Sequence, residues 1–223
     1  MDKICLIEMQ AGLGDICFVQ KIAKLYIEDG YKVIWPVLSQ LMYVRNYIKV
    51  DGLEFIDASK TFLDEIPSVV LPLGIADRYF EGSVLEAKYK FFDWDYKDWA
   101  NYFTFERNKE KEEALFNQLG LEGKKYTLIN KKYGTPPNFK EKEVYTEGDN
   151  EIVEIQFLEG FCPFDWCKVI EEANQISIVD TSYNYIIEKL DLKATKMFLT
   201  SRFTPSNFTD IQNLFTEKWI KIQ

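Results

Sequence analysis

Short apolar runs alternate along the chain with longer segments in which apolar residues recur at the spacing of a helix. The first such segment places Ile16, Val19, Ala23 and Tyr26 on one face, and Gly30 follows as a stop signal. A shorter helix is predicted over 41–48. The apolar runs have the length of strands and cover 4–7, 33–35, 53–56 and 69–73. Strands that alternate with helices predict a parallel sheet with crossover connections.

A second series of the same kind begins after a charged helix predicted over 108–119, which Gly120 ends. Pro163 at a first-turn position indicates one further helix, and apolar spacing in 186–190 and 211–215 indicates two more. The polar segment 133–150 contains glycines and prolines and is predicted to be a loop. The strands of this series are predicted at 127–130, 153–158, 176–179, 196–199 and 219–222.

These patterns predict an α/β protein made of two small Rossmann-like halves with parallel sheets. The N-terminal half covers 1–122 and the C-terminal half covers 123–223, with a linker over 120–125.

Polar residues stand where one strand of each half passes into its helix. In the second half, the run 176–179 leads through Asp180, Thr181 and Ser182 into a helical pattern. Hydroxyl groups and unpaired backbone N–H groups at the start of a helix favour a phosphate. In the first half, the run 4–7 leads into the sequence Gly-Leu-Gly-Asp at 12–15. Two such elbows predict two halves that face one cleft.

Composition narrows the classes of function. The 223 residues carry a formal net charge of −9, which disfavours a broad nucleic-acid surface because phosphate contacts need clustered Lys and Arg. No apolar segment approaches the roughly 20 residues of a membrane span, and the N-terminus enters a strand instead of a signal peptide, so we expect a cytoplasmic protein. The chain has no histidine, and any general base is therefore Asp, Glu, Lys, Tyr or Cys.

The four cysteines indicate neither disulfides nor a zinc site. Cys5 and Cys17 fall on apolar faces, and Cys162 and Cys167 have no second pair at metal spacing. We expect reduced thiols in the core, and neither a metal nor a cofactor.

The Gly-x-Gly sequence formed by Gly12 and Gly14 is not a dinucleotide fingerprint. Cys17 occupies the third small position, and the second strand ends without an acidic residue for a ribose. Asp15 follows at the carboxyl end of the first strand, where open α/β sheets bind their ligands. A carboxylate there can accept a proton from an attacking hydroxyl. The alternative is that Asp15 caps the following helix.

Residues 89–105 are crowded with aromatic side chains, with Asp93, Asp95 and Asp98 between them. Such a segment can stack on a sugar ring and hydrogen-bond its hydroxyls, because aromatic rings offer flat apolar faces and carboxylates accept from O–H groups. The alternative is that the rings pack the segment onto the core.

The combined pattern resembles the heptosyltransferase-like glycosyltransferases of the GT-B fold. The first half of those enzymes opens with a strand, a Gly-x-Gly-Asp-like loop and a helix, as 8–19 do here. Their second half carries a Val-Asp-Thr-Gly-like elbow, to which the sequence at 179–182 is similar. The resemblance implies a shortened GT-B fold with a nucleotide-sugar donor in the second half. It also implies a glycan, lipid or other sugar acceptor in the first.

Residue roles follow from the same resemblance. Asp15 matches the catalytic base, in the substrate-binding loop that contains Gly12 and Gly14. The elbow that contacts the donor diphosphate corresponds to Asp180, Thr181 and Ser182.

Basic residues complete the expected donor site. Either Lys131 or Lys132 stands where the family has a basic residue after the first strand of the second half, and lysine suffices as a point charge on phosphate. The alternative is that both are exposed loop lysines. Arg202 is a further candidate for the donor phosphate, with a surface salt bridge as the alternative.

The chain departs from the family in three respects. Ser182 replaces the usual glycine, and Tyr185 stands where histidine is common and can replace it only as a neutral hydrogen-bond donor. The chain is also shorter than typical members.

The predicted function is transfer of a sugar from a nucleotide sugar to an unknown acceptor hydroxyl, with inversion and without a metal. The alternatives are a nucleotide-sugar-binding or scaffold protein with a decayed active site, and a sugar-nucleotide epimerase. The sequence leaves an oligomer open.

Overall fold

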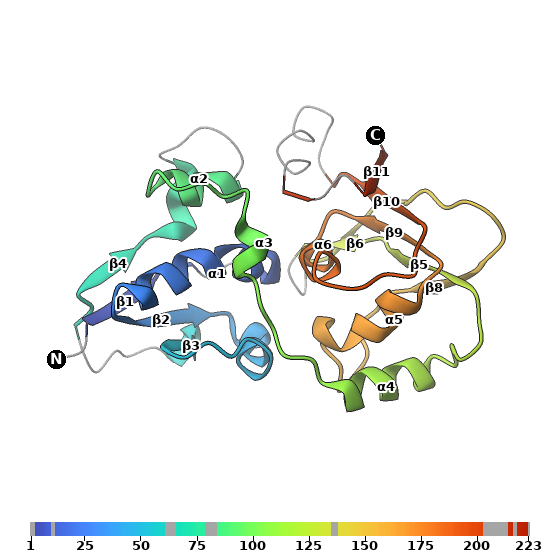
Figure 1. The fold of residues 1–223 in the computed structure, drawn as a ribbon, viewed down its shortest axis with the longest axis horizontal. Helices are drawn as coiled ribbons and strands as arrows, with labels where there is room; N and C mark the ends of the chain where they lie inside the picture. The colour runs from blue at the N-terminus through green and yellow to red at the C-terminus, as the bar shows by residue number, and fades with distance from the viewer. Residues whose placement is uncertain are drawn as a thin grey trace. The chain divides into compact units, whose positions relative to one another are not determined.

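The computed structural model describes residues 3–9, 12–60, 66–78, 84–134, 138–202, 214–215 and 218–222. It divides the chain into two compact units, Met1–Glu106 and Arg107–Gln223 (Figure 1). The predicted helix over 211–215 lies largely outside the described residues.

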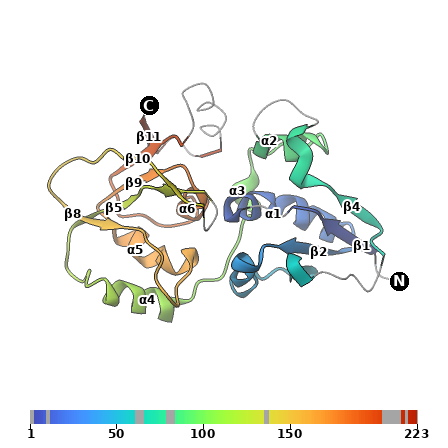
Figure 2. The ribbon, with the colours of Figure 1, turned by 180° about the vertical axis from the view of Figure 1, so that it is seen from behind.

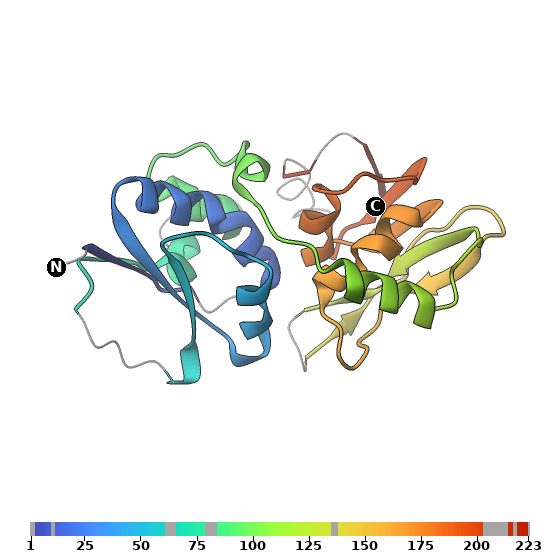
Figure 3. The same cartoon turned by 60° about the horizontal axis from the view of Figure 1, so that its bottom comes forward.

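The first unit contains a parallel sheet of four strands in the order β3-β2-β1-β4. All four predicted strands are confirmed, as β1 (Lys3–Ile7), β2 (Tyr31–Val37), β3 (Leu53–Asp57) and β4 (Val69–Leu71). Figure 3 shows α1 (Leu13–Glu28), coloured blue, lying across one face of this sheet. Ile16, Val19 and Ala23 are buried, as the helical spacing predicted. The helix predicted over 41–48 is instead a 3-10 helix, η1 (Ser39–Asn46).

The aromatic segment packs against α1 through α2 (Val84–Lys90) and α3 (Trp99–Tyr102). Tyr89, Trp99 and Phe103 are buried, and the Tyr89 ring meets Phe18 edge-on with centroids 4.9 Å apart. Asp98, one of the interleaved carboxylates, pairs with Lys21 of α1 at 2.5 Å. For Tyr89, Trp99 and Phe103 the alternative of core packing is confirmed, because these rings are buried in the first unit.

The second unit contains a five-stranded parallel sheet in the order β11-β10-β9-β5-β8. The predicted strands are present, although β8 begins earlier and ends sooner than 153–158. The helices are α4 (Lys109–Gln118), η4 (Pro163–Trp166), α5 (Cys167–Glu172) and α6 (Ser182–Ile187), and α4 lies beside α5 (Figures 1 and 2). The strands are β5 (Tyr126–Asn130), β8 (Glu151–Glu154), β9 (Gln175–Val179), β10 (Lys196–Thr200) and β11 (Trp219–Ile222).

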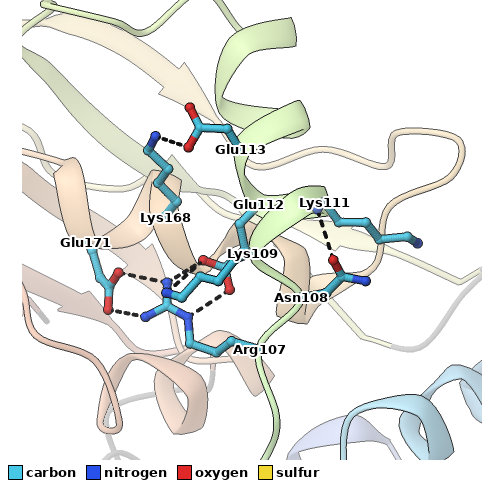
Figure 4. A network of polar contacts seen from close by, with 8 residues as sticks. All are labelled: Arg107, Asn108, Lys109, Lys111, Glu112, Glu113, Lys168 and Glu171. Atoms are coloured by element: carbon cyan, nitrogen blue, oxygen red, sulfur yellow. Dashed lines mark hydrogen bonds and ion pairs between the residues drawn. The ribbon is translucent and has the colours of Figure 1, made fainter.

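The second unit begins at Arg107 because α4 packs on it. The Arg107 guanidinium donates from Nε to Glu112 of α4 at 2.7 Å and from Nη1 to Glu171 of α5 at 2.5 Å (Figure 4). The hydrogen bonds that Arg107 donates to Glu112 and Glu171 raise the pKa of Arg107, so this group stays charged. The predicted division at residue 122 therefore falls inside the second unit, after α4, which belongs to that unit.

The segment predicted as a loop over 133–150 contains regular structure. β6 (Lys132–Tyr133) pairs antiparallel with β7 (Lys140–Glu141), which makes a short two-stranded ladder. The backbone N–H of Lys142 extends the pairing by donating to Lys131 O at 3.0 Å.

The four cysteines are free thiols, and Cys5, Cys17 and Cys167 are buried. Burial raises the pKa of Cys5 to about 12, so this thiol is unreactive at neutral pH.

Candidate functional site

Three neighbouring parallel strands of the second unit end at the same edge of their sheet. Asn130 at the end of β5 lies opposite Ile178 of β9, and Thr200 at the end of β10 lies opposite Val179. The residues that follow these strands therefore gather at one carboxyl edge. The structure thus brings together the predicted donor residues of three separate stretches: Lys131 and Lys132, Asp180 to Ser182, and Arg202.

The elbow between β9 and α6 is held by a capping box and by a contact from β5. Thr181 is the N-cap of α6, and its Oγ1 accepts the N–H of Tyr183 at 3.4 Å. Its own N–H donates to Asn184 Oδ1 at 2.8 Å. Asn130 donates from Nδ2 to Thr181 Oγ1 at 3.2 Å, which joins the ends of β5 and β9.

Asn130 and Asn184 were missed by the sequence reasoning. The spacing of Thr181 and Asn184, which matches a capping box, was a signal for Asn184. Asn130 could be found only by knowing that β5 and β9 are neighbours.

Asp180 is buried at this edge, with its carboxylate Oδ2 3.5 Å from Nε of Arg202. Burial raises its pKa, and the Arg202 charge and backbone N–H partly oppose that effect. The N–H of Asp180 donates to Thr200 O at 3.0 Å. Within the described part of the chain, Asp180 Oδ2, Asn184 Nδ2 and Thr200 Oγ1 are buried atoms without a hydrogen-bond partner.

The two candidate lysines are paired with carboxylates of the β7 segment. Lys131 Nζ lies 2.8 Å from Glu143, and this hydrogen bond raises the pKa of Lys131. Lys132 Nζ lies 3.8 Å from Glu141. Their side chains are 28% and 39% exposed, so both remain within reach of a ligand that replaces the carboxylates.

Lys142 is a further cation at this edge that the sequence reasoning missed. Its Nζ donates to the backbone oxygen of Ser201 at 2.6 Å, which fixes the β6–β7 ladder against the end of β10. Its place in a segment predicted to be a loop gave no signal for this contact.

Ser182 and Tyr185 occupy different environments. Ser182 is the first residue of α6 and is half-buried beside the elbow. Tyr185 is buried, and its ring meets Phe215 edge-on with centroids 5.3 Å apart. The Tyr185 ring therefore takes part in core packing.

In the first unit, Asp15 lies in the first turn of α1, after the carboxyl end of β1. The N-cap of α1 is Gly12. The helix begins at Leu13, three residues before Ile16, so Gly14 lies inside it. Asp15 is therefore not the N-cap residue, and its Oδ1 lies 2.9 Å from Nζ of Lys88 on α2. Lys88 was missed by the sequence reasoning because nothing local links it to residue 15.

Within the described ranges, no three His, Cys, Asp or Glu side chains gather in a way that could hold a metal ion.

None of the described helices is long and apolar enough to cross a membrane.

Two glycosyltransferase structures share this architecture. The glycosyl transferase of family 9 from Veillonella parvula matches with a TM-score of 0.57 and 10% identity, over 99% of this chain and 86% of its own. The chain has the fold of a GT-B glycosyltransferase. The same fold occurs in TibC, an iron-containing dodecameric glycosyltransferase of enterotoxigenic E. coli, with a TM-score of 0.53 and 10% identity. That match covers 98% of this chain and 62% of TibC, so the chain spans less than two thirds of TibC's length.

At the level of sequence, no protein-family model and no curated protein gives a significant match. The GT-B likeness therefore rests on the fold.

Proposed function

We propose that this protein is a glycosyltransferase that moves a sugar from a nucleotide-sugar donor to an acceptor hydroxyl. The observation that carries the proposal is the meeting of the predicted phosphate contacts at one carboxyl edge of a GT-B-like fold. The donor diphosphate would lie against Lys131, Lys132 and Arg202, next to the elbow that begins at Asp180. A glycan, a lipid or another sugar would act as the acceptor in the first unit.

The proposed reaction is a single displacement. The acceptor oxygen attacks the anomeric carbon of the donor sugar, and its proton moves to the Asp15 carboxylate. The bond between the anomeric carbon and the diphosphate oxygen breaks, and its electron pair leaves with the nucleoside diphosphate. The cationic side chains of the second unit stabilise that departing charge. Attack from the face opposite the leaving group inverts the anomeric centre.

The carboxylates of Glu143 and Glu141, which lie beside Lys131 and Lys132, are compatible with a donor diphosphate at these lysines. Lys131 Nζ lies 2.8 Å from Glu143 and Lys132 Nζ lies 3.8 Å from Glu141, and both carboxylates are exposed. A diphosphate offers more negative charge and more acceptor oxygens than one carboxylate, so it competes for the same ammonium groups. Donor binding then exchanges one set of partners for another.

A thermal-shift panel of nucleoside diphosphates and nucleotide sugars tests the donor site. A ligand that binds only the folded protein raises the apparent melting temperature. The double variant Lys131→Met/Lys132→Met should lose most of the shift, because each charge-assisted contact contributes about 1.5–3 kcal/mol. Lys124→Met is the matched control, since Lys124 forms an exposed ion pair with Glu151 in the same unit.

The outcomes separate the candidate functions. A shift in the control and none in the double variant supports the donor site. No shift with any nucleotide, from folded protein, contradicts the donor site. Binding without release of nucleoside diphosphate in the presence of sugar acceptors indicates the decayed binding protein. An altered nucleotide sugar formed without an acceptor indicates the epimerase.

A further inference from the structure

Lys88 is a buried charge that faces the candidate base. Its side chain is 2% exposed, and its Nζ lies 2.9 Å from Oδ1 of Asp15, whose side chain is 22% exposed. Removing an ammonium from water is costly unless a carboxylate or several acceptors compensate it. The fold therefore keeps a buried ammonium, at a cost in desolvation, beside Oδ1 of Asp15, whose carboxylate is still partly exposed to solvent.

The contact between Lys88 and Asp15 is set by the packing of α2 on α1. Tyr89 follows Lys88 and is buried, and its hydroxyl donates to the backbone oxygen of Phe18 at 2.5 Å. The Tyr89 ring also meets the Phe18 ring edge-on. Phe18 lies one helical turn after Asp15, so both contacts start from one face of α1 and reach two consecutive residues of α2. This double attachment fixes the ammonium relative to the carboxylate.

We propose that Lys88 is a positioning residue for Asp15. Its ammonium binds Oδ1, holds the carboxylate in one orientation and leaves Oδ2 to accept the proton of the acceptor hydroxyl. The inference rests on the proposed function, in which Asp15 is the base. Orientation matters because a displacement of about 1 Å in a reacting group can cost on the order of 100-fold in rate.

A second lysine of the first unit provides a matched control. Lys21 of α1 pairs with Asp98 at 2.5 Å, with side chains 8% and 40% exposed. This pair also joins a nearly buried ammonium to a partly exposed carboxylate, and it ties α1 to the aromatic segment. Its carboxylate is not a candidate base. Lys21→Met therefore removes a nearly buried ion pair without touching Asp15. Because Lys21 Nζ also lies 5.9 Å from the centroid of the Tyr89 ring, this variant also reports any loss of kcat that comes from disturbing Tyr89.

The test measures release of nucleoside diphosphate from the nucleotide sugars of the thermal-shift panel, with kcat and the donor KM determined separately. For Lys88→Met we expect kcat to fall about 100-fold and the donor KM to stay within about twofold, because donor contacts are made by the other unit. Lys21→Met should keep its kcat. In Lys88→Ala, added n-propylammonium should restore part of kcat by supplying the missing charge.

Each outcome decides a different point. Folded Lys88→Met with the kcat of the wild type overturns the positioning role and leaves the proposed function intact. Equal loss of kcat in Lys88→Met and Lys21→Met, without rescue by the amine, also overturns it, because the effect is then structural. If Lys88→Met does not fold, Lys88→Gln is judged by the same criterion. No release from the wild type with any donor overturns the proposed function, and this inference with it.

Discussion

Asp180 is an acid that folding moves out of water at the edge of the second sheet. Burial raises its pKa above the ordinary value of 3.8, and the charge and backbone N–H of Arg202 compensate only part of that effect. An acid with a raised folded-state pKa contributes stability that is present below its unfolded pKa and is lost as the pH rises through the folded value. The ionised form of Asp180 therefore costs stability at neutral pH. Groups kept at such a cost concentrate at functional sites.

Because the pKa of Asp180 is raised, the effect of Asp180→Asn on stability should depend on pH. The amide avoids the cost of burying a charge, so the variant should gain stability relative to the wild type at pH 7. It should gain less at pH 3, where the acid is already protonated in both states. Urea unfolding at the two pH values measures the difference, with the exposed Asp149→Asn as control. A stability change that is the same at both pH values would contradict this account.

The ion pair of Asp15 and Lys88 predicts that a single variant loses more stability than the double variant. Asp15→Asn replaces the carboxylate that faces the buried Lys88 ammonium with a neutral amide and should destabilise the first unit by about 1–3 kcal/mol. Adding Lys88→Met removes the buried charge and should recover much of that loss. Denaturant unfolding of the single and double variants measures the coupling. If the double variant is no more stable than Asp15→Asn, the ion pair has little energetic importance.

At the scale of elements, the β6–β7 ladder depends on the backbone at Gly134. This residue has φ +102°, and a Cβ there would lie 2.9 Å from the backbone oxygen of Asn138. The same ladder carries Lys132 and precedes Lys142, which reaches the end of β10. The ladder therefore couples one turn to the arrangement of cations at the candidate donor site.

Gly134→Ala should open this ladder. The left-handed backbone alone costs about 1–2 kcal/mol for a residue with a Cβ, and the clash with Asn138 adds to it. Hydrogen exchange at the Lys142 N–H, which donates to Lys131 O, should become about tenfold faster or more. Gly160→Ala is the control, because Gly160 has φ +85° with nothing within 4 Å of its Cβ. Unchanged exchange at Lys142 would show that the ladder does not depend on this turn.

The sequence predicted the strands and both elbows because these depend on local pattern. An apolar run of strand length followed by Asp180 and Thr181 carries both the strand and the helix start within a few residues. The structure then gathers the predicted lysines and Arg202 beside the elbow because parallel neighbours end at one edge.

The remaining features depend on contacts between residues far apart in the sequence. The pairing of Asp15 with Lys88 and the link from Lys142 to Ser201 join separate elements, which no periodicity encodes. The compact units of the structure meet between Glu106 and Arg107, and the local pattern did not show this position for the same reason. The charged helix α4 has the pattern of a solvated surface, and only its contacts with α5 assign it to the second unit. The aromatic segment left two interpretations open, because ring spacing alone does not distinguish core packing from a sugar platform.

At the scale of the whole molecule, the chain passes from one unit to the other between two neighbouring anchored residues. The Glu106 N–H donates to Tyr47 O at 2.7 Å within the first unit. Arg107 binds Glu112 and Glu171 within the second (Figure 4). Each unit also has its own sheet, and the candidate base and the candidate donor contacts belong to different units. We therefore expect two unfolding transitions, which calorimetry can separate.

Arg107→Met should lower the transition of the second unit and leave the first unchanged. Its guanidinium compensates Glu112, which is 1% exposed, and Glu171, which is 20% exposed. Removing it leaves a buried carboxylate with Lys109 at 3.5 Å as a weaker partner, at a cost of about 3 kcal/mol. The exposed Lys124–Glu151 pair belongs to the same unit, and Lys124→Met should change stability by less than about 1 kcal/mol. If Arg107→Met shifts both transitions equally, the two units unfold as one, and the division of the molecule at this residue has no thermodynamic meaning.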